Sequence, residues 1–212
     1  MGAGRSTARP TASLPFTMRA VLIIANPNPD GFSHALAERA IAGLTAAGHQ
    51  VLVHDLYAEG FGAAMSAEER QAYHGEHPAL DPLVVEHIAD LTDAEIVVFV
   101  YPTWWSSVPA ILKGWFERVL VPGTGFVFDG DGKVKPGLTN VRRLVGISTY
   151  GSPWVSVKIT NDNGRRIIMR AMRLSTGLRT RCNWLGLYAM DTVSDTERAS
   201  FLDRVERKMA RL

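Results

Sequence analysis

The sequence predicts one α/β domain in which helices cover both faces of a five-stranded parallel sheet, with the strands in the order 2-1-3-4-5. Three observations support this three-layer sandwich. Five short apolar runs alternate with stretches of helical periodicity. The run at residues 96–101 is unbroken and rich in β-branched side chains, which is typical of a strand buried on both faces. The length of 212 residues suits a single core.

The expected elements follow one another along the chain, with turn-forming residues between them. Strands are predicted at residues 19–25, 50–55, 96–101, 143–149 and 180–189. Helices are predicted at residues 34–43, 66–73, 81–90, 164–175 and 195–211. Ser33 and Ser194 are the expected N-caps of the first and last helices. A short hairpin is expected within residues 121–132, with Asp131 and Gly132 at or near its turn.

A further helix is predicted after Pro109, and it is apolar over most of its surface. A helix with one solvated side carries a narrower apolar stripe. Either this helix is sandwiched in the core, or its excess apolar face meets a second subunit. The apolar residues concerned are Ile111, Leu112, Trp115, Phe116, Val119 and Leu120.

The ends and the composition of the chain bear on domain limits and compartment. Residues 1–17 lack periodicity and acidic side chains, so they are expected to form a disordered N-terminal extension before a single domain at 18–212. No apolar run approaches the roughly 20 residues that span a bilayer. The single cysteine, Cys182, excludes an internal disulfide and fits a reducing, cytoplasmic location.

Three predicted loops follow the first, third and fourth strands, and the predicted strand order brings them to one edge of the sheet. The loop after residues 96–101 contains two adjacent tryptophans, Trp104 and Trp105, which are costly to leave in water. These residues are interpreted as the edge of a site for a flat aromatic cofactor. The alternative is a rim that packs against neighbouring chain or a partner subunit.

The loop after the first strand is a candidate phosphate site. It combines a glycine-containing turn, a serine hydroxyl and the start of a helix, where backbone N–H groups are free. The glycine pattern of a dinucleotide-binding loop and the lysine of a P-loop are both missing. His74 and His77 have a spacing that a helical metal site could use, but Gly75 and Pro78 oppose a helix there, so no metal site is predicted.

Positive charge is concentrated in the second half of the chain. Residues 141–181 contain nine lysines or arginines and one acid, Asp162, although the net charge of the whole chain is only +2. This segment forms either a solvated basic face or a field that attracts an anionic partner such as a nicotinamide phosphate. Nucleic acid is not expected, because no aromatic residues interleave with the charges.

The chain resembles the flavodoxin-like NAD(P)H:quinone oxidoreductase family. The strongest match is residues 109–119 directly after the Trp104–Trp105 loop, and the Asp55-Leu-Tyr57 segment and the first loop with Phe32 also fit. The similarity extends from about Arg19 to Gly151. It implies a homodimer with its active site at the interface, in which NAD(P)H and a quinone react in turn with a bound flavin.

The resemblance also implies which residues hold the flavin, which is usually FAD in this family. Its phosphates would lie on Asn26, Phe32, Ser33 and the backbone at His34. Its ring would lie against Pro102, Thr103, Trp104, Trp105, Thr149, Tyr150 and Gly151. Backbone N–H groups of Trp104, Trp105 and Gly151 would stabilise the negative charge of the reduced ring. Glu117 would lie near the adenine across the dimer, which favours FAD, whereas a shortened segment at residues 70–80 leaves FMN open.

One departure from the family concerns proton and charge transfer. Animal members carry a tyrosine and a histidine beyond the fourth strand, and these places fall on Ser156 and Asp162 here, so that relay is not carried over. Two other functions stay open. They are a flavodoxin-type electron carrier, and a flavin-bearing regulatory subunit of a membrane transporter.

Overall fold

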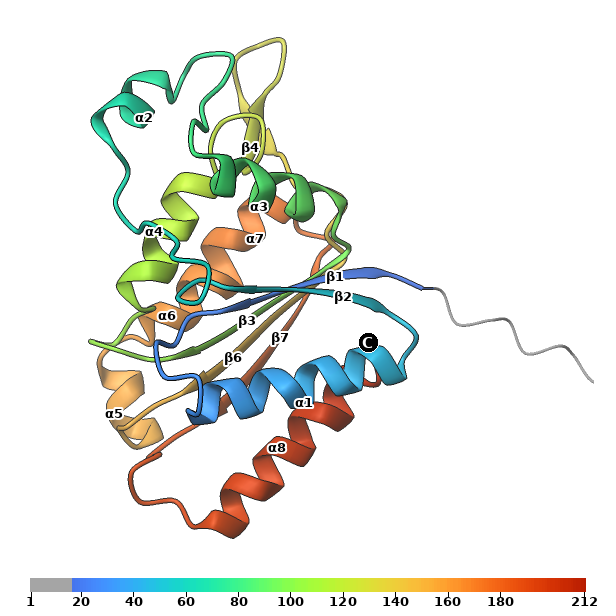
Figure 1. Cartoon of the computed structure of the whole chain (residues 1–212), viewed down its shortest axis with the longest axis vertical. Coiled ribbons are helices and arrows are strands. Elements are labelled where there is room, and N and C mark those ends of the chain that lie inside the picture. The colour runs from blue at the N-terminus through green and yellow to red at the C-terminus, as the bar shows by residue number, and fades with distance from the viewer. Residues whose placement is uncertain (1–16) are drawn as a thin grey trace, which may run out of the picture.

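The computed structural model describes residues 17–212, and Figure 1 shows a twisted sheet between two layers of helices. The sheet strands are β1 (Arg19–Ile24), β2 (Gln50–Asp55), β3 (Ile96–Pro102), β6 (Arg143–Thr149) and β7 (Arg181–Leu187). All neighbouring pairs are parallel, in the order β2-β1-β3-β6-β7. Counted along the chain within this sheet, that order is the predicted 2-1-3-4-5. The predicted extension at 1–17 lies almost wholly outside the described residues.

The central strand explains why its sequence is an unbroken apolar run. Val97 and Phe99 pack into the core on one face of the sheet, and Val98 and Val100 pack into the core on the other. Successive side chains of a strand point to opposite faces, so a strand covered on both sides needs apolar residues at every position. Burial on both sides fixes β3 at the middle of the molecule.

Two layers of helices supply these cores. Helices α1 (Phe32–Ala46) and α8 (Asp195–Met209) lie together on one face (Figure 1). The opposite face carries α3 (Pro82–Asp93), α4 (Ala110–Val119), α6 (Asn163–Arg166), η1 (Ile167–Met172) and α7 (Arg173–Thr176). Two short helices, α2 (Ala67–Ala72) and α5 (Trp154–Ile159), lie in connections. None of the helices in the described part of the chain is both long and apolar enough to cross a membrane.

The first helix begins earlier than predicted. Its N-cap is Gly31, without a side-chain cap, and Ser33 lies inside the first turn. The cause is the preceding turn, in which Asn26 Oδ1 accepts from the Asn28 N–H and the Asn28 carbonyl accepts from the Gly31 N–H. The expectation that Ser33 caps this helix is therefore wrong, because the chain has already turned at Gly31.

The other helices agree with the sequence predictions only in part. Ser194 caps α8, as predicted, and the structure adds a full capping box with Glu197. The single helix expected at 164–175 is instead α6, the π-helical η1 and α7 in succession. Helix α5 was not predicted.

Helix α4 is sandwiched in the core, which decides between the two alternatives for its apolar surface. Leu112, Trp115 and Val119 are fully buried within one chain. At Gly114 the helix meets the loop before α2 so closely that an added Cβ would lie 2.0 Å from the Ala63 carbonyl oxygen. The excess apolar surface therefore needs no second subunit to cover it.

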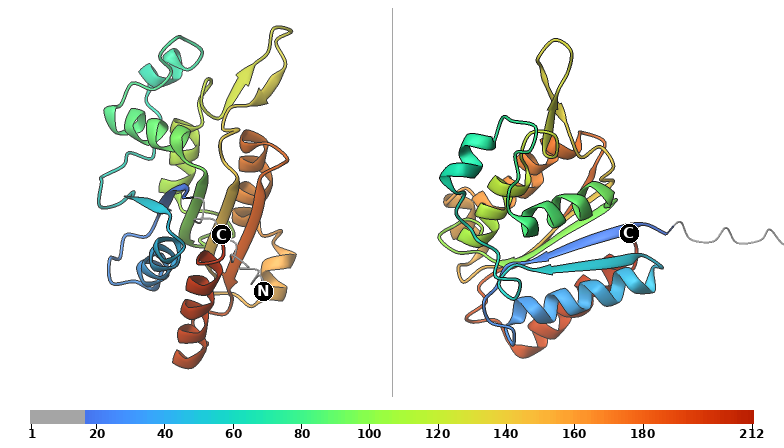
Figure 2. Two further views of the ribbon diagram at one scale, coloured as in Figure 1. Left: turned by 90° about the vertical axis from the view of Figure 1, so that its right-hand side faces the viewer. Right: turned by 45° about the horizontal axis from the view of Figure 1, so that its top comes forward.

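A hairpin is present, but it extends beyond the predicted range of 121–132: β4 (Phe126–Phe128) lies within that range and β5 (Val134–Pro136) follows it, and the two strands pair antiparallel. Gly132 takes a positive φ of 75° in its turn, and its N–H donates to the Asp129 carbonyl. Both views of Figure 2 show this hairpin projecting from the body of the molecule.

Candidate active site at the edge of the sheet

The loop after β3 is a tight turn that displays tryptophan. Trp104 and Ser107 exchange both backbone hydrogen bonds, at 3.1 and 3.0 Å. The two residues between them, Trp105 and Ser106, have φ values of 47° and 58°, as both central residues of a type I′ turn do. The Trp105 side chain is fully exposed and that of Trp104 is nearly half exposed. The turn thus holds strained, non-glycine backbone in order to present an aromatic edge.

The turn changes the availability of the backbone donors expected at this site. The Trp104 N–H donates to Ser107 within the turn, so it is not free as expected. The N–H groups of Trp105 and Gly151 have no hydrogen-bond partner within residues 17–212. Two of the three expected donors are therefore available for an anionic acceptor.

The loop after β6 is fastened to the chain that follows β7. The Tyr150 N–H donates to Leu187, the Met190 N–H donates to Tyr150, and the Ala189 N–H donates to Ser152. The start of the β3 loop is tied to β6 in turn, because the Thr103 N–H donates to the Thr149 carbonyl. These bonds fix the two loops relative to the same edge of the sheet.

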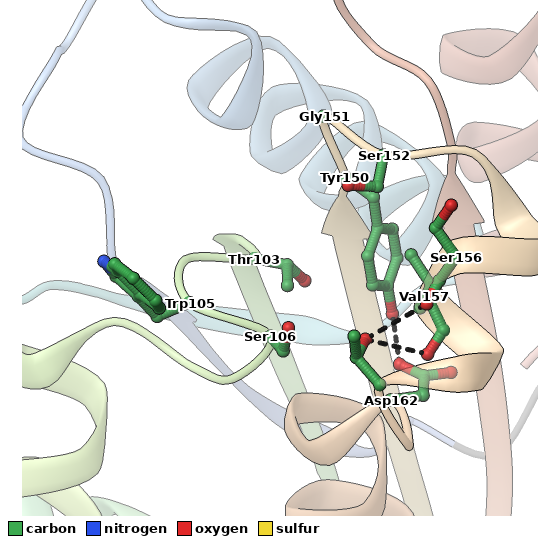
Figure 3. Close-up of a pocket in the computed structure, with 10 residues that line it drawn as sticks. Thr103, Trp105, Ser106, Tyr150, Gly151, Ser152, Ser156, Val157 and Asp162 are labelled. Carbon is green, nitrogen blue, oxygen red and sulfur yellow. Dashed lines mark hydrogen bonds between the residues drawn. The ribbon is translucent and has the colours of Figure 1, made fainter.

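A cavity of about 300 Å³ lies between these loops and α5. In Figure 3, Thr103 and Ser106 face Tyr150 across it, while the ring of Trp105 points away from Tyr150. Gly151, Ser152, Ser156, Val157, Thr160 and Asp162 complete the lining. The structure therefore brings the second and third predicted loops together, as the strand order implied.

The floor of the cavity is a buried phenol–carboxylate pair. The Tyr150 hydroxyl donates to Asp162 Oδ1 at 2.9 Å (Figure 3), and its ring stacks on Tyr188 with 4.5 Å between centroids. Burial, reinforced by the charge of Asp162, raises the pKa of Tyr150. Lys158 and Arg165 lie 3.2 and 3.8 Å from the other oxygen of Asp162 and balance its charge. The phenol is therefore held neutral and fixed in orientation.

The loop after β1 does not line this cavity, but it provides a separate polar site at the start of α1. The N–H groups of Phe32 and Ser33 have no partner among residues 17–212, and Gly31 lies so close to Asn28 that an added Cβ would meet its carbonyl oxygen at 2.9 Å. The His34 backbone N–H, which was expected at the phosphate, donates instead to the Gly31 carbonyl at 2.9 Å. His34 Nε2 forms a hydrogen bond with Asp55 Oδ2 at 2.9 Å, while His34 Nδ1 is buried without a partner among residues 17–212. Free N–H groups at the start of a fifteen-residue helix fit an anionic group such as a phosphate.

The remaining predicted residues divide between the site and the surface. Pro102 ends β3 at the site edge, beside Thr149 on β6. Glu117 is exposed on α4 and pairs with Lys113 in the same helix, and it does not line the cavity. His74 and His77 are exposed in the loop after α2.

Comparison with known proteins places this arrangement in a family. A family model described as flavodoxin-like fold matches residues 18–175. The chain belongs to this flavodoxin-like family.

Among curated relatives, this flavodoxin-like protein is 33% identical over 149 residues to NAD(P)H dehydrogenase (quinone) 1 of Rattus norvegicus, covering 63% of this chain and 54% of the relative. It is 32% identical over 164 residues to the ribosyldihydronicotinamide dehydrogenase (quinone) of Pongo abelii, covering 69% of each. It therefore spans only about half the length of the rat protein. A solved NAD(P)H:quinone oxidoreductase from Methanothermobacter marburgensis superposes with a TM-score of 0.77 at 26% identity, over 92% of this chain and 98% of that one.

The flavodoxin-like protein also contains a buried cluster that sequence reasoning missed. His54, at the end of β2, stacks on His87 of α3 with 3.8 Å between ring centroids. Glu59 bonds both rings, at 2.9 and 3.1 Å, and Asp90 bonds the other nitrogen of His54. These three side chains, His54, Glu59 and His87, have the spacing of metal ligands.

The hydrogen bond from Trp115 decides how this cluster is interpreted. Trp115 Nε1 can only donate, and it lies 2.8 Å from His87 Nδ1. A neutral His87 then carries its proton on Nε2, the nitrogen that faces Glu59 and that a metal would need as a lone-pair donor. The cluster is therefore a satisfied hydrogen-bond network that joins β2, α3 and α4.

Sequence reasoning also missed the role of Asp162. The two positions reached by counting from animal relatives, Ser156 and Asp162, both line the cavity. Counting positions could not show that Asp162 accepts a hydrogen bond from the hydroxyl of Tyr150, which lies twelve residues away. A single acid within a basic segment was the signal available in the sequence.

Proposed function

We propose that this protein is a flavin-dependent NAD(P)H oxidoreductase that transfers two electrons as hydride from NAD(P)H, through bound flavin, to a quinone or similar acceptor by a ping-pong mechanism. The observation that carries the proposal is the cavity between the Trp104–Ser107 turn and the loop that starts at Tyr150. It lies at the carboxyl edge of the sheet, where open α/β folds bind ligands. The chain's quinone dehydrogenase relatives supply the reaction class.

The residues present fit two parts of one flavin, its phosphate and its ring. The start of α1, with the free N–H groups of Phe32 and Ser33, would hold its phosphate. The β3 turn and residues 149–151 would hold its ring, with the Trp105 indole covering one edge. When bound, the flavin supplies the hydride-accepting and hydride-donating chemistry.

The protein contributes orientation and electrostatics to this reaction. The N–H groups of Trp105 and Gly151 would donate to a cofactor oxygen that gains negative charge, without any titrating side chain. The Tyr150 hydroxyl donates its hydrogen bond to Asp162 and keeps its proton, because burial raises its pKa, so the phenol forms a rigid neutral wall. Proton transfer by a tyrosine–histidine relay has no counterpart among the residues that line this cavity.

Whether the flavin is FAD or FMN is a separate question, which analysis of the released cofactor would answer. The resemblance favours FAD, and an adenine near Glu117 was part of that expectation. Glu117 pairs with Lys113 and lies outside the cavity, so it gives FAD no support within one chain. Two solved proteins of the same fold are described with FMN, at 14% and 18% identity, which reflects the fold alone. Heat release and chromatography of the bound cofactor distinguish the two.

Two alternative functions are less well supported. A flavodoxin-type carrier presents an acidic surface to its redox partners, whereas this chain has a net charge of +2 and a basic second half. A regulatory subunit of a membrane transporter would act through a partner, and the cavity would still hold flavin. A homodimer with a shared site, and a cytoplasmic location, stay predictions.

The deciding experiment is steady-state oxidation of NADH and NADPH with a benzoquinone after the protein has been loaded with FAD or FMN. Turnover with parallel lines in double-reciprocal plots is expected for the ping-pong enzyme. Fast one-electron exchange without turnover would favour the carrier. Protein that stays colourless after reconstitution would contradict the proposed flavin site altogether.

A further inference from the structure

A second cavity, of about 350 Å³, adjoins the one already described, and cationic side chains dominate its lining. The two cavities share one residue, Asp162. The cations of the second cavity are Lys158, Arg165, Arg166, Arg170 and Arg173. We name this cavity, defined by those five residues, the basic groove.

The local helix geometry gathers these charges on one side. Arg166, Arg170 and Arg173 recur every three or four residues along α6, η1 and α7, which is the spacing of one helix face. The middle of this stretch is π-helical, a conformation that is rare and is concentrated at functional sites. The sequence therefore places like charges side by side, where they repel one another unless an anion is present.

The charges of the basic groove are only partly balanced. Lys158 and Arg165 both form ion pairs with Oδ2 of the buried Asp162. The other oxygen of Asp162, Oδ1, accepts a hydrogen bond from the Tyr150 hydroxyl. The side chains of Arg166 and Arg170 are exposed and have no hydrogen bond or ion pair to any of residues 17–212. Five cations thus face a single acid in a concave surface, which concentrates positive potential there.

We propose that the basic groove binds the phosphate groups of the reduced nicotinamide dinucleotide, and that it favours NADPH over NADH. This inference rests on the proposed function. A dinucleotide whose nicotinamide enters the first cavity would extend past Asp162 into the groove, because the two cavities adjoin there. Arginine binds phosphate through paired, charge-assisted hydrogen bonds, and the 2′-phosphate of NADPH adds an anion that NADH lacks.

The test uses flavin-loaded protein and the double variant Arg166→Glu/Arg170→Glu. Both side chains are exposed and have no partner in the described part of the chain, so the fold is expected to be retained. The ratio of kcat/KM for NADPH to that for NADH is expected to fall about tenfold, mainly through KM. The control is Arg207→Glu, which makes half of this charge change at an exposed arginine of α8 on the opposite face of the sheet and should leave the ratio unchanged.

A binding measurement separates this inference from the proposed reaction. Adenosine 2′,5′-bisphosphate should bind the unmodified protein measurably by calorimetry, more weakly as salt is raised, and about tenfold more weakly in the double variant. Quinone turnover with an unchanged NADPH-to-NADH ratio would overturn the groove proposal and leave the reaction standing. Bisphosphate binding without any quinone turnover would overturn the proposed reaction and leave the groove proposal standing. Preferential binding of a single-stranded oligonucleotide, abolished by the same variant, would also overturn it.

Discussion

At the scale of single residues, Asp162 combines a buried carboxylate with a backbone φ of 49°. We expect Asp162→Asn to lower the free energy of unfolding by about 1–2 kcal/mol, because it removes the charge that Lys158 and Arg165 face. Asparagine tolerates this left-handed conformation, and alanine does not. Asp162→Ala should therefore cost about 1 kcal/mol more, since it also leaves the Tyr150 hydroxyl without an acceptor. Urea unfolding measures both, and equal losses would contradict the argument.

Trp105 provides a prediction in which stability and binding separate. Its side chain is fully exposed, so Trp105→Ala should change the free energy of unfolding by no more than about 0.5 kcal/mol. The same variant should lose flavin more readily, by roughly tenfold in Kd, because it removes an aromatic wall of the proposed ring site. Flavin absorbance after gel filtration gives the measurement. Phe128→Ala in the projecting hairpin is the control, and equal flavin content in both variants would remove Trp105 from the site.

The site residues show what sequence can and cannot reveal at this scale. Trp104 and Trp105 were found because two indoles in a loop need an explanation. The closed turn that engages the Trp104 N–H was missed, because it depends on positive φ at Trp105 and Ser106, which neither residue type signals. Ser33 was misassigned as a cap because the preceding asparagines turn the chain through their own side chains. Local hydrogen bonding of this kind competes with the simple capping pattern.

At the scale of elements, α4 depends on a glycine that helix propensity would disfavour. Alanine is better than glycine in a helix by about 1 kcal/mol, yet Gly114→Ala would place a methyl group 2.0 Å from the Ala63 carbonyl oxygen. We therefore expect a net loss of about 2–3 kcal/mol in the free energy of unfolding. Gly130→Ala is the control, because an added Cβ there meets no atom within 4 Å. A stabilised Gly114→Ala variant would contradict this packing.

The His54–Glu59–His87 network joins three elements and predicts a pH dependence. Burial, assisted by the charge of His54, lowers the pKa of His87 to about 4 from the ordinary 6.5. His87 is neutral in both states above pH 6.5, so its contribution is fully present there. Between pH 6.5 and 4 the unfolded chain takes up a proton that the folded chain refuses, and the free energy of unfolding should fall by about 3 kcal/mol.

The variant His87→Gln isolates this effect. Glutamine can still accept from Trp115 and donate to Glu59, but it does not titrate. The comparison is needed because burial raises the pKa of Glu59, and stability from protonated Glu59 is lost as pH rises, which is the opposite trend. Urea midpoints from pH 7 to 4 should be flatter in the variant than in the unmodified protein. Parallel curves would assign the acid sensitivity to other groups.

Elements were predictable where one physical cause dominates. Strands β2 and β6 have the predicted bounds, because apolar runs bounded by polar residues leave little choice. Helix α5 was missed because Val155 and Ile159 are exposed, so its apolar residues follow no pattern set by a core. The break of the predicted 164–175 helix into a π-helical middle has no sequence signal that we can identify.

At the scale of the whole molecule, the predicted homodimer has lost one of the arguments for it. Helix α4 buries its apolar face within one chain, so that face no longer argues for a partner. If the flavin site is shared between subunits, flavin content and dimerisation should rise together with protein concentration. Sedimentation velocity with detection at the flavin absorbance tests this. A stable monomer that retains its full flavin would contradict a shared site.

The five tryptophans of this chain differ widely in exposure, which has a practical consequence. Trp115 is wholly buried, whereas Trp105 stands in water on the rim of the cavity. Trp104 and Trp154 are also partly exposed, so several indoles contribute to the emission of solvated tryptophan. A flavin bound at the cavity would quench tryptophan emission by energy transfer, and comparison with Trp105→Ala would isolate the contribution of the indole on the rim. The intrinsic fluorescence of the protein would therefore report flavin binding at the cavity without any attached label.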